Sequence, residues 1–468
     1  MDSARPVDRR YDLDALRVLA VLLLIVFHSA RVFDVFDPFY VKNPETSDAL
    51  SWAVVAFLNP WHMPLLFVLA GAATWLALGH RGPEGYVAER TRRLLIPFLF
   101  GVLLIVPPQA LLASRFRGDD RSVASFLGDY WTVEGDLTGY DGSFTPAHLW
   151  FIGFLFIFSL AALPLFVRWH GRRLRTRWLL FAMPLVLVAA NELPAPNDGP
   201  QNPWYSLALF VAGFLLLADE RTEGVVQRCW RPLLAAAVVT MTMVMLVWSS
   251  GTGDGWRDGS PVDVGFSVLE EANTWLWVLA LLGAGKALLG SPIRGLRYAS
   301  EASFPFYVLH QTVIVAVAYV VVDWRLGVWE KFTTVALASL VLTLLLYQLL
   351  VRRTRLTRFL FGMKRSPGRP SAARSGSGAK RGLWGQAGDS VAVDVVLSRA
   401  GDHDGRDGAG STGVSAGGSR PGTSAGSSPA KAMAVASTLI MSTRPSVAPS
   451  RSSITKSKSS TLHSGSWE

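Results

Sequence analysis

The chain has little charge and almost no cysteine. Only 17% of its 468 residues are Asp, Glu, Lys or Arg, whereas soluble proteins carry about 25%. Cys229 is the one cysteine in the sequence, so no intrachain disulfide can form. The first apolar run lacks a small-residue cleavage site, and we therefore expect no cleaved signal peptide. These deficits point away from an ordinary soluble protein.

Long apolar runs recur along the sequence, and half of all residues are hydrophobic. A helix needs roughly 20 mainly apolar residues to cross the hydrocarbon core of a bilayer. We therefore predict an all-α, polytopic transmembrane helix bundle of about ten spans. The expected spans are 15–33, 54–78, 94–113, 148–167, 178–192, 204–218, 232–249, 268–289, 304–322 and 330–351.

The net charge of +10 comes from arginines in short clusters between the apolar runs. Such clusters favour membrane orientation over nucleic-acid binding, and we expect no nucleic-acid partner. If the loops alternate between two sides, those on the side of the N-terminus carry 18 Lys and Arg, and the others carry 7. Because basic loops stay inside the cell, we predict a multi-pass plasma-membrane protein with both termini in the cytoplasm.

The composition changes after residue 363. Segments such as "GSTGVSAGGSRPGTSAGSSPAKA" are rich in Gly, Ser, Ala and Pro and lack apolar periodicity. Segments of this kind cannot bury enough apolar surface to offset the entropy of ordering. We therefore predict a membrane domain over 1–363 and a disordered, low-complexity cytoplasmic tail over 364–468.

Arg17 and His28 enclose ten residues without a polar side chain, "RVLAVLLLIVFH". Eleven positions are close to three helical turns, so both side chains lie on nearly the same face, roughly 16 Å apart along the axis. A histidine with an unperturbed pKa of about 6.5 can accept a proton. Ionisable groups inside a membrane are rare and commonly functional. His28 is therefore a candidate general base, and a single interhelical hydrogen bond is the structural alternative.

Arg90 and Arg93 are three residues apart and share one face of the helix that enters the third span. Arginine is suited to a bidentate grip on phosphate. We expect this pair on the same side of the membrane as Arg17. The alternative is an ordinary cluster of positive charge that sets topology.

Further histidines lie in or beside the apolar spans. The segment "NPWHMPLLFVLAG" contains His62, "PAHLWFIGF" contains His148 and Trp150, and "SFPFYVLHQT" contains Tyr307 and His310. Helical metal sites use histidines three or four residues apart, and no pair in the sequence has that spacing. We therefore predict no metal site.

These motifs, in this order, resemble the acyltransferase 3 family of membrane acyltransferases. That family includes bacterial O-acetyltransferases of surface polysaccharides and the glucan biosynthesis protein C group. The family's second motif usually reads Phe-Phe-x-x-Ser-Gly, where this chain has Leu66, Phe67, Ala70 and Gly71. The matching segments, which run from about residue 11 to 350, are "LDALRVLAVLLLIVFH", "MPLLFVLAG", Arg90-x-x-Arg93 before "LLIPF", "HLWFIGFLF" and "YVLHQ".

The resemblance implies transfer of an acyl group, acetyl or succinyl, from acyl-coenzyme A to a hydroxyl of a carbohydrate or other cell-surface acceptor. No permanently bound cofactor is implied. In this interpretation His28 is the general base, with a covalent acyl-histidine as a second possibility. The implied donor-binding residues are Arg17, Arg90 and Arg93, and the implied substrate-orienting residues are His148, Trp150, Tyr307 and His310.

Two other functions fit parts of the sequence. A transporter of a polar metabolite or lipid-linked sugar would use the buried histidines as proton relays, but inverted repeats and broken helices are not evident. A purely structural or sensory membrane protein would leave the arginines on the side of Arg17 without a role.

Overall fold

The computed structural model describes residues 9–36, 38–133, 137–172, 174–195, 197 and 199–363. The tail predicted at 364–468 lies outside these described residues, so its disorder and the boundary after residue 363 stay predictions.

Regular structure is entirely helical over the part of the chain that the structure describes. This confirms the predicted all-α class. The helices are α1 (Tyr11–Ala30), α2 (Asp48–Leu50), α3 (Phe57–His80), α4 (Pro83–Arg90), α5 (Ile96–Phe100), α6 (Val106–Phe116), α7 (Val123–Tyr130), α8 (Trp150–Ala161), α9 (Leu163–Trp169), α10 (Leu179–Asn191), α11 (Pro203–Ala218), α12 (Glu220–Arg228), α13 (Trp230–Ser250), α14 (Pro261–Leu288), α15 (Leu296–Val321), α16 (Val328–Leu346) and α17 (Arg355–Leu360).

Six helical segments of the described chain are long and apolar enough to cross a membrane, and the number rises to eight if each of two bent helix pairs is one span. The α8–α9 pair bends by 55° and the α11–α12 pair by 97°. Each of the ten predicted spans lies on a helix. However, α10 is shorter than the six, and α14 is not among the candidate spans. A multi-pass helical bundle is therefore established, and ten spans stay a prediction.

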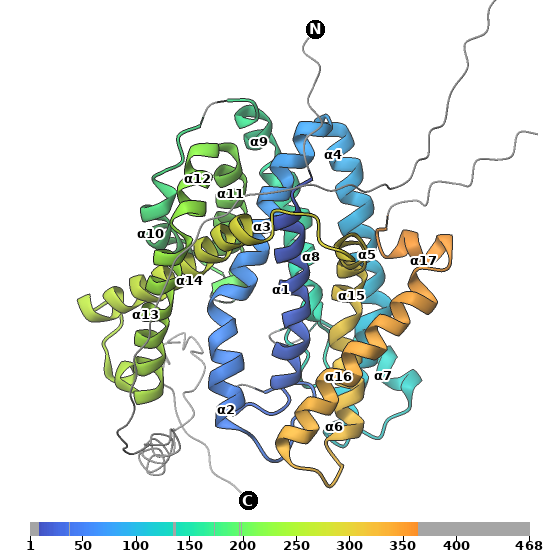
Figure 1. Cartoon of the computed structure of the whole chain (residues 1–468). Coiled ribbons are helices and arrows are strands. Elements are labelled where there is room, and N and C mark those ends of the chain that lie inside the picture. Colours follow the sequence, from blue (N-terminus) through green and yellow to red (C-terminus); the bar gives the residue numbers. More distant parts are fainter. Residues whose placement is uncertain are drawn as a thin grey trace, which may run out of the picture. The chain divides into compact units, whose positions relative to one another are not determined.

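The helices run between two ends of the bundle (Figure 1). The start of α1, the end of α3 and α4 lie at one end, which we call the proximal end. The helix α2, the end of α6 and α7 lie at the opposite, distal end. The helix α1 packs against α3, α14, α15 and α16, so it occupies a central position. A side chain on α1 can therefore meet side chains from several other helices.

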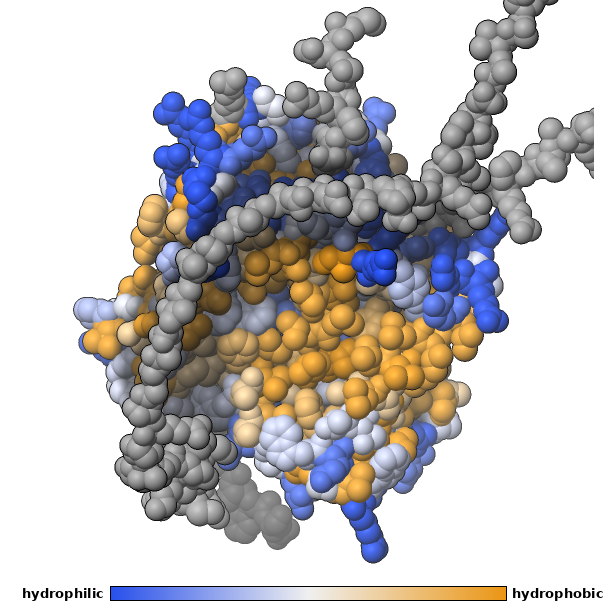
Figure 2. Space-filling model, in the orientation of Figure 1, coloured by the Kyte–Doolittle hydropathy of each residue, from blue (hydrophilic) through white to orange (hydrophobic). Residues whose placement is uncertain are grey.

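An apolar belt crosses the visible face of the molecule between its more polar ends (Figure 2). Leu337 and Val341 of α16 are 58% and 54% exposed, and Phe181 of α10 is 83% exposed. Soluble monomers rarely expose apolar surface on this scale. These helices therefore expose apolar side chains on the outside of the bundle, as expected for spans that lie in lipid.

Two glycines bring the backbones of α3 and α11 into direct contact. A Cβ atom added to Gly71 would lie 1.9 Å from the backbone oxygen of Phe210. A Cβ added to Gly213 would lie 2.0 Å from the backbone oxygen of Val68. Small residues at such crossings let helices approach closely, which is a common way to pack helices in membranes. Gly71, which closes the second of the sequence motifs, thus serves this crossing.

We expect Gly71→Ala and Gly213→Ala each to destabilise the detergent-solubilised protein by about 2–3 kcal/mol, because either methyl group collides with backbone that cannot rotate away. Thermal unfolding followed by size-exclusion fluorescence measures the effect. Gly265→Ala in α14 is the matched control, since that position has open space around it. An unchanged melting temperature for both crossing variants would show that the two helices do not touch.

Candidate active site

Three imidazoles from separate parts of the chain lie in contact inside the bundle. His28 is near the end of α1, His148 lies in the single 3₁₀ turn Ala147–Leu149 before α8, and His310 is in the middle of α15. The ring centroids of His28 and His310 are 5.2 Å apart, and those of His148 and His310 are 4.9 Å apart. We call these residues the histidine trio. The structure thus brings together three of the residues that the sequence singled out separately.

Backbone carbonyls fix the protonation pattern of two members of the trio. The Nδ1 atom of His310 lies 2.6 Å from the carbonyl oxygen of Tyr307, and Nε2 of His148 lies 3.1 Å from that of Val308. A carbonyl only accepts hydrogen bonds, so each of these nitrogens carries a proton and the other ring nitrogen is a lone-pair acceptor when the ring is neutral. Those other nitrogens, together with Nδ1 of His28, are buried and have no hydrogen-bond partner among the described residues.

Tyr307 belongs to the same cluster, whereas Trp150 does not touch the trio. The Tyr307 hydroxyl donates to the backbone oxygen of His148, and its ring centroid lies 5.6 Å from that of His148. The aromatic neighbours of Trp150 are Phe67, Phe151 and Phe154 instead. A role for Trp150 in orienting substrate therefore needs a ligand that extends beyond the trio, and it stays a prediction.

The distal side of His28 is covered by the loop that follows α1. The Phe39 ring stacks on the His28 ring at 6.2 Å between centroids with 17° between planes. Arg31 extends over Phe39 and forms an ion pair with the buried Asp34 at 3.2 Å. Lys42 also contacts Asp34, at 2.9 Å. This charge cluster holds the loop against the end of α1 that bears the candidate base.

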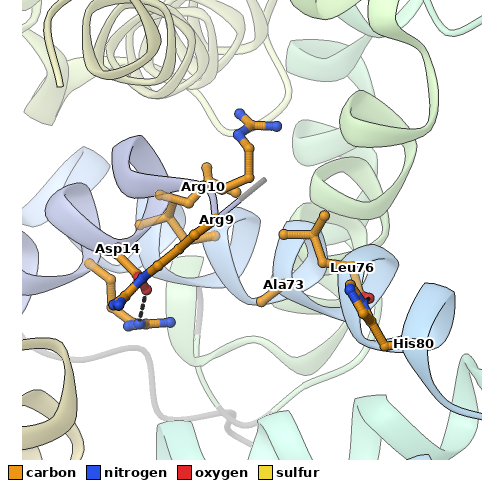
Figure 3. Close-up of a pocket in the computed structure, with 9 residues that line it drawn as sticks. Arg9, Arg10, Asp14, Ala73, Leu76 and His80 are labelled. Carbon is orange, nitrogen blue, oxygen red and sulfur yellow. Dashed lines mark hydrogen bonds and ion pairs between the residues drawn. The ribbon is translucent and has the colours of Figure 1, made fainter. Parts of the chain in front are cut away.

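A pocket of about 290 Å³ opens at the proximal end. Its lining includes Arg17 and the residues that precede it on α1, whereas the trio lies toward the other end of that helix. Figure 3 shows Arg9 and Asp14 on one wall, with Ala73, Leu76 and His80 along α3 on the other. The remaining lining residues are Arg10, Leu13, Arg17 and Leu69. The pocket therefore joins a cationic rim to an apolar wall.

Asp14 holds two of the arginines at the rim. Its Oδ2 atom accepts from Nε and Nη2 of Arg9 at 2.9 and 2.7 Å, and its Oδ1 accepts from Nη2 of Arg17. Ser300 of α15 also accepts from Arg17, at 2.8 Å. Each guanidinium keeps further N–H groups, and 39% of each arginine side chain is exposed. The two cations are thus positioned in advance, with donors left for an anion.

A second charge network lies beside the pocket. Arg10 points away from Asp14 in Figure 3, and its Nη2 contacts Asp12 at 2.6 Å and Glu223 at 2.5 Å. Lys286 shares Glu223 at 2.8 Å. Burial alone would lower the pKa of Arg10, but the carboxylates of Asp12 and Glu223 outweigh it and raise that pKa above its ordinary value. Arg10 therefore ties α1 to α12 as a permanent cation.

Arg90 and Arg93 do not line this pocket. Arg90 lies over the Tyr86 ring at 4.7 Å and donates to Thr74 at 3.1 Å. Arg93 forms an ion pair with Glu89 at 3.3 Å. Arg17 lines the pocket without this pair, and the donor-binding role predicted for Arg90 and Arg93 stays a prediction.

His62 is a buried histidine with a structural role. Its Nε2 atom lies 2.7 Å from the carbonyl oxygen of Ala20, so it links α3 to α1 between the pocket and the trio.

At the motif position where the family usually has Ser, this chain has Ala70, whose carbonyl oxygen accepts a hydrogen bond from the Thr74 hydroxyl at 3.0 Å. Thr74 in turn accepts from Arg90. A hydroxyl is therefore present one helical turn further along α3.

Sequence reasoning missed Arg9, Asp14 and His80 as pocket residues, and it missed Ser300 as the partner of Arg17. The segment "RRYDLDALR" does hold a signal, because Arg9, Asp14 and Arg17 alternate in charge over little more than two turns. The contribution of Ser300 has no such signal, since it depends on how α15 packs against α1.

Among the described residues, no group of three His, Cys, Asp or Glu side chains is arranged to hold a metal ion. The predicted absence of a bound cofactor is not tested by the structure.

Comparison with known proteins identifies the class. A family model described as "Acyltransferase domain" matches residues 10–352, and the chain belongs to this family, acyltransferase 3. It is an integral-membrane acyltransferase by family and fold. Relatives named glucans biosynthesis protein C, from Shigella dysenteriae serotype 1 (strain Sd197), Escherichia coli (strain K12) and Escherichia coli O157:H7, are each 20% identical over 386 residues. That match covers 77% of this chain and 96% of each relative. No solved structure matches the chain.

We expect Asp34→Asn to lower the stability of the protein by about 2–3 kcal/mol, because the substitution removes the carboxylate that Arg31 and Lys42 contact in a buried site. Thermal unfolding in detergent measures the loss. Asp129→Asn is the control, since the Asp129 side chain is 71% exposed and its surface pair with Arg121 is worth at most about 1 kcal/mol. Equal melting temperatures for the two variants would contradict a stabilising role for the Asp34 cluster.

Proposed function

We propose that this protein transfers an acyl group, acetyl or succinyl, from acyl-coenzyme A to a hydroxyl of a carbohydrate or other cell-surface acceptor. The observation that carries the proposal is the position of His28. Its Nδ1 atom is buried and unpaired, and it lies on the same helix as an arginine that lines a cationic pocket. Membership of an acyltransferase family supports the reaction type, and the name of the relatives, glucans biosynthesis protein C, supports an acceptor related to glucan.

The proximal pocket suits the polar part of such a donor. Coenzyme A carries phosphates at one end and a thioester on a long flexible arm at the other. Arg17 and Arg9 offer N–H groups to phosphate oxygens, in the fork geometry that favours bidentate contacts. Leu13, Leu69 and Leu76 supply apolar surface for the less polar parts of the molecule.

The arm would run along α1 toward the trio. Arg17 and His28 are eleven residues apart, which places them roughly 16 Å apart along the helix axis. His28 accepts the proton of the acceptor hydroxyl while that oxygen attacks the thioester carbonyl, and the coenzyme A thiolate leaves. Base catalysis of this kind typically contributes about 10²–10⁴-fold to the rate. Tyr307, His148 and His310 orient the reacting groups.

The proposal includes a topology. Ten spans, with α10 and α14 counted as crossing segments, place both termini in the cytoplasm of a plasma-membrane protein. The 18 basic residues on the side of the N-terminus against 7 on the other support this orientation. The pocket then faces the compartment that contains acyl-coenzyme A, and the trio lies nearer the outer surface, where a cell-surface acceptor is found.

We expect membranes containing the protein to transfer label from acetyl- or succinyl-coenzyme A to an acceptor, and His28→Ala to reduce the rate at least about 10²-fold because the general base is lost. The matched control is His62→Gln, since the amide nitrogen of Gln can still donate to the carbonyl of Ala20. Protein level in the membrane is measured for each. Uptake of a solute without thioester turnover would favour a transporter, and full transfer by His28→Ala would remove the proposed base.

We expect Arg17→Ala to weaken binding of coenzyme A about tenfold or more, because one charge-assisted contact is worth roughly 1.5–3 kcal/mol. Arg90→Ala and Arg93→Ala are expected to weaken binding less, since both side chains lie outside the pocket. Equilibrium binding of labelled coenzyme A at low and high salt measures these effects, and low salt enlarges them. Unchanged affinity in Arg17→Ala would place the donor elsewhere.

A further inference from the structure

The trio holds three ring nitrogens that make no hydrogen bond to another described residue. With His148 and His310 each donating to a backbone carbonyl, the buried nitrogens left over are Nδ1 of His28, Nδ1 of His148 and Nε2 of His310. These nitrogens belong to adjoining rings, and within the described residues no hydrogen bond fixes which nitrogen of a neutral His28 carries the proton, so a proton taken up by the trio can be held on more than one ring.

The trio also lacks the carboxylate that commonly supports a catalytic histidine. In serine hydrolases a buried Asp orients the imidazole and stabilises its protonated form. Within the described ranges, no Asp or Glu makes a hydrogen bond or ion pair with a trio residue. The carboxylate of Asp34, in the loop that follows α1, is engaged by Arg31 and Lys42. The positive charge formed on His28 therefore has imidazole rings, rather than an anion, beside it.

We propose that the trio holds the transferred proton as one unit, with His310 as the relay that takes the proton from His28 and returns it. This inference rests on the proposed acyl transfer. The acceptor oxygen loses its proton to His28 and bonds to the thioester carbon, and the carbon–sulfur bond breaks. The proton passes from His28 to Nε2 of His310 while the thiolate departs, and it returns through His28 to the thiolate sulfur. All three imidazoles end neutral, and the products are the ester and free coenzyme A.

His310 is the natural centre of this relay, because its ring contacts both of the others at 5.2 and 4.9 Å. It is fully buried, and Phe306 stacks parallel to it, so its ring is held in place from a third side. Its proton on Nδ1 is occupied by the Tyr307 carbonyl, which leaves Nε2 for exchange. A small rotation of the His28 ring, or one bridging water, completes the path.

Substitution by an amide separates proton transfer from position. The side-chain nitrogen of Asn occupies nearly the place of Nδ1 in His, so His310→Asn keeps a donor for the Tyr307 carbonyl but cannot carry a proton. By the same reasoning, His148→Gln keeps the donor for the Val308 carbonyl. His62→Gln is the matched control, because it preserves the Ala20 contact outside the trio. A purely structural His310 predicts an active His310→Asn enzyme.

The test measures transfer from labelled acetyl-coenzyme A by the full chain in membranes, with kcat and KM determined separately. The relay predicts that His310→Asn lowers kcat by about 10² or more and changes KM for acetyl-coenzyme A less than about threefold. It also predicts that the control variant His62→Gln keeps the wild-type rate. For His310→Ala, the relay predicts that added imidazole restores activity in proportion to the concentration of its free base. This measurement also tests the relay if the His310→Asn variant is unstable.

The outcomes separate the two proposals. An active wild-type protein together with a fully active His310→Asn variant overturns the relay alone. Absence of turnover in the wild-type protein overturns the acyl-transfer proposal, and the relay with it. Loss of kcat in His310→Asn, with rescue of His310→Ala by imidazole base, supports the relay.

Discussion

Side-chain donors paired with backbone carbonyls of neighbouring helices set the internal arrangement of this bundle. Apolar surroundings supply no water to satisfy a polar side chain, so it must find its partner on another helix or in its own backbone. His62 uses the carbonyl of Ala20, His148 that of Val308 and Thr312 that of Ile105. Trp275 of α14 donates to the carbonyl of Leu179 at the start of α10 in the same way. Each bond fixes the register of two segments, and together they determine which imidazole nitrogens remain for chemistry.

The candidate site has two parts, the proximal pocket and the histidine trio, and different interactions hold their side chains in place. At the proximal end, Asp14 restrains Arg9 and Arg17, so less side-chain entropy remains to be lost when an anion binds. At the trio, packing of three rings keeps neutral bases together without an anion beside them. The helix α1 carries one element of each part, and its rigidity therefore sets the spacing between the cationic rim and the base.

Much of the fold was predictable because apolar length is a strong signal: every predicted span lies on a helix. The alignment of Arg17 and His28 followed from helical periodicity alone. The contact between His28, His148 and His310 was not predictable from the residues, since it depends on the packing of segments distant in sequence. Likewise, the hydrogen bond from Arg90 to Thr74 depends on the turn between α3 and α4, which spacing along the chain does not reveal.

The crossing of α3 and α11 has a mechanical consequence. With the backbone of each helix pressed against the other at Gly71 and Gly213, neither can slide or rotate without collision. Any relative displacement of helices in this bundle must then be borne by helices outside this pair. The wall of the pocket that Leu69, Ala73 and Leu76 contribute from α3 is therefore fixed in place by the crossing with α11.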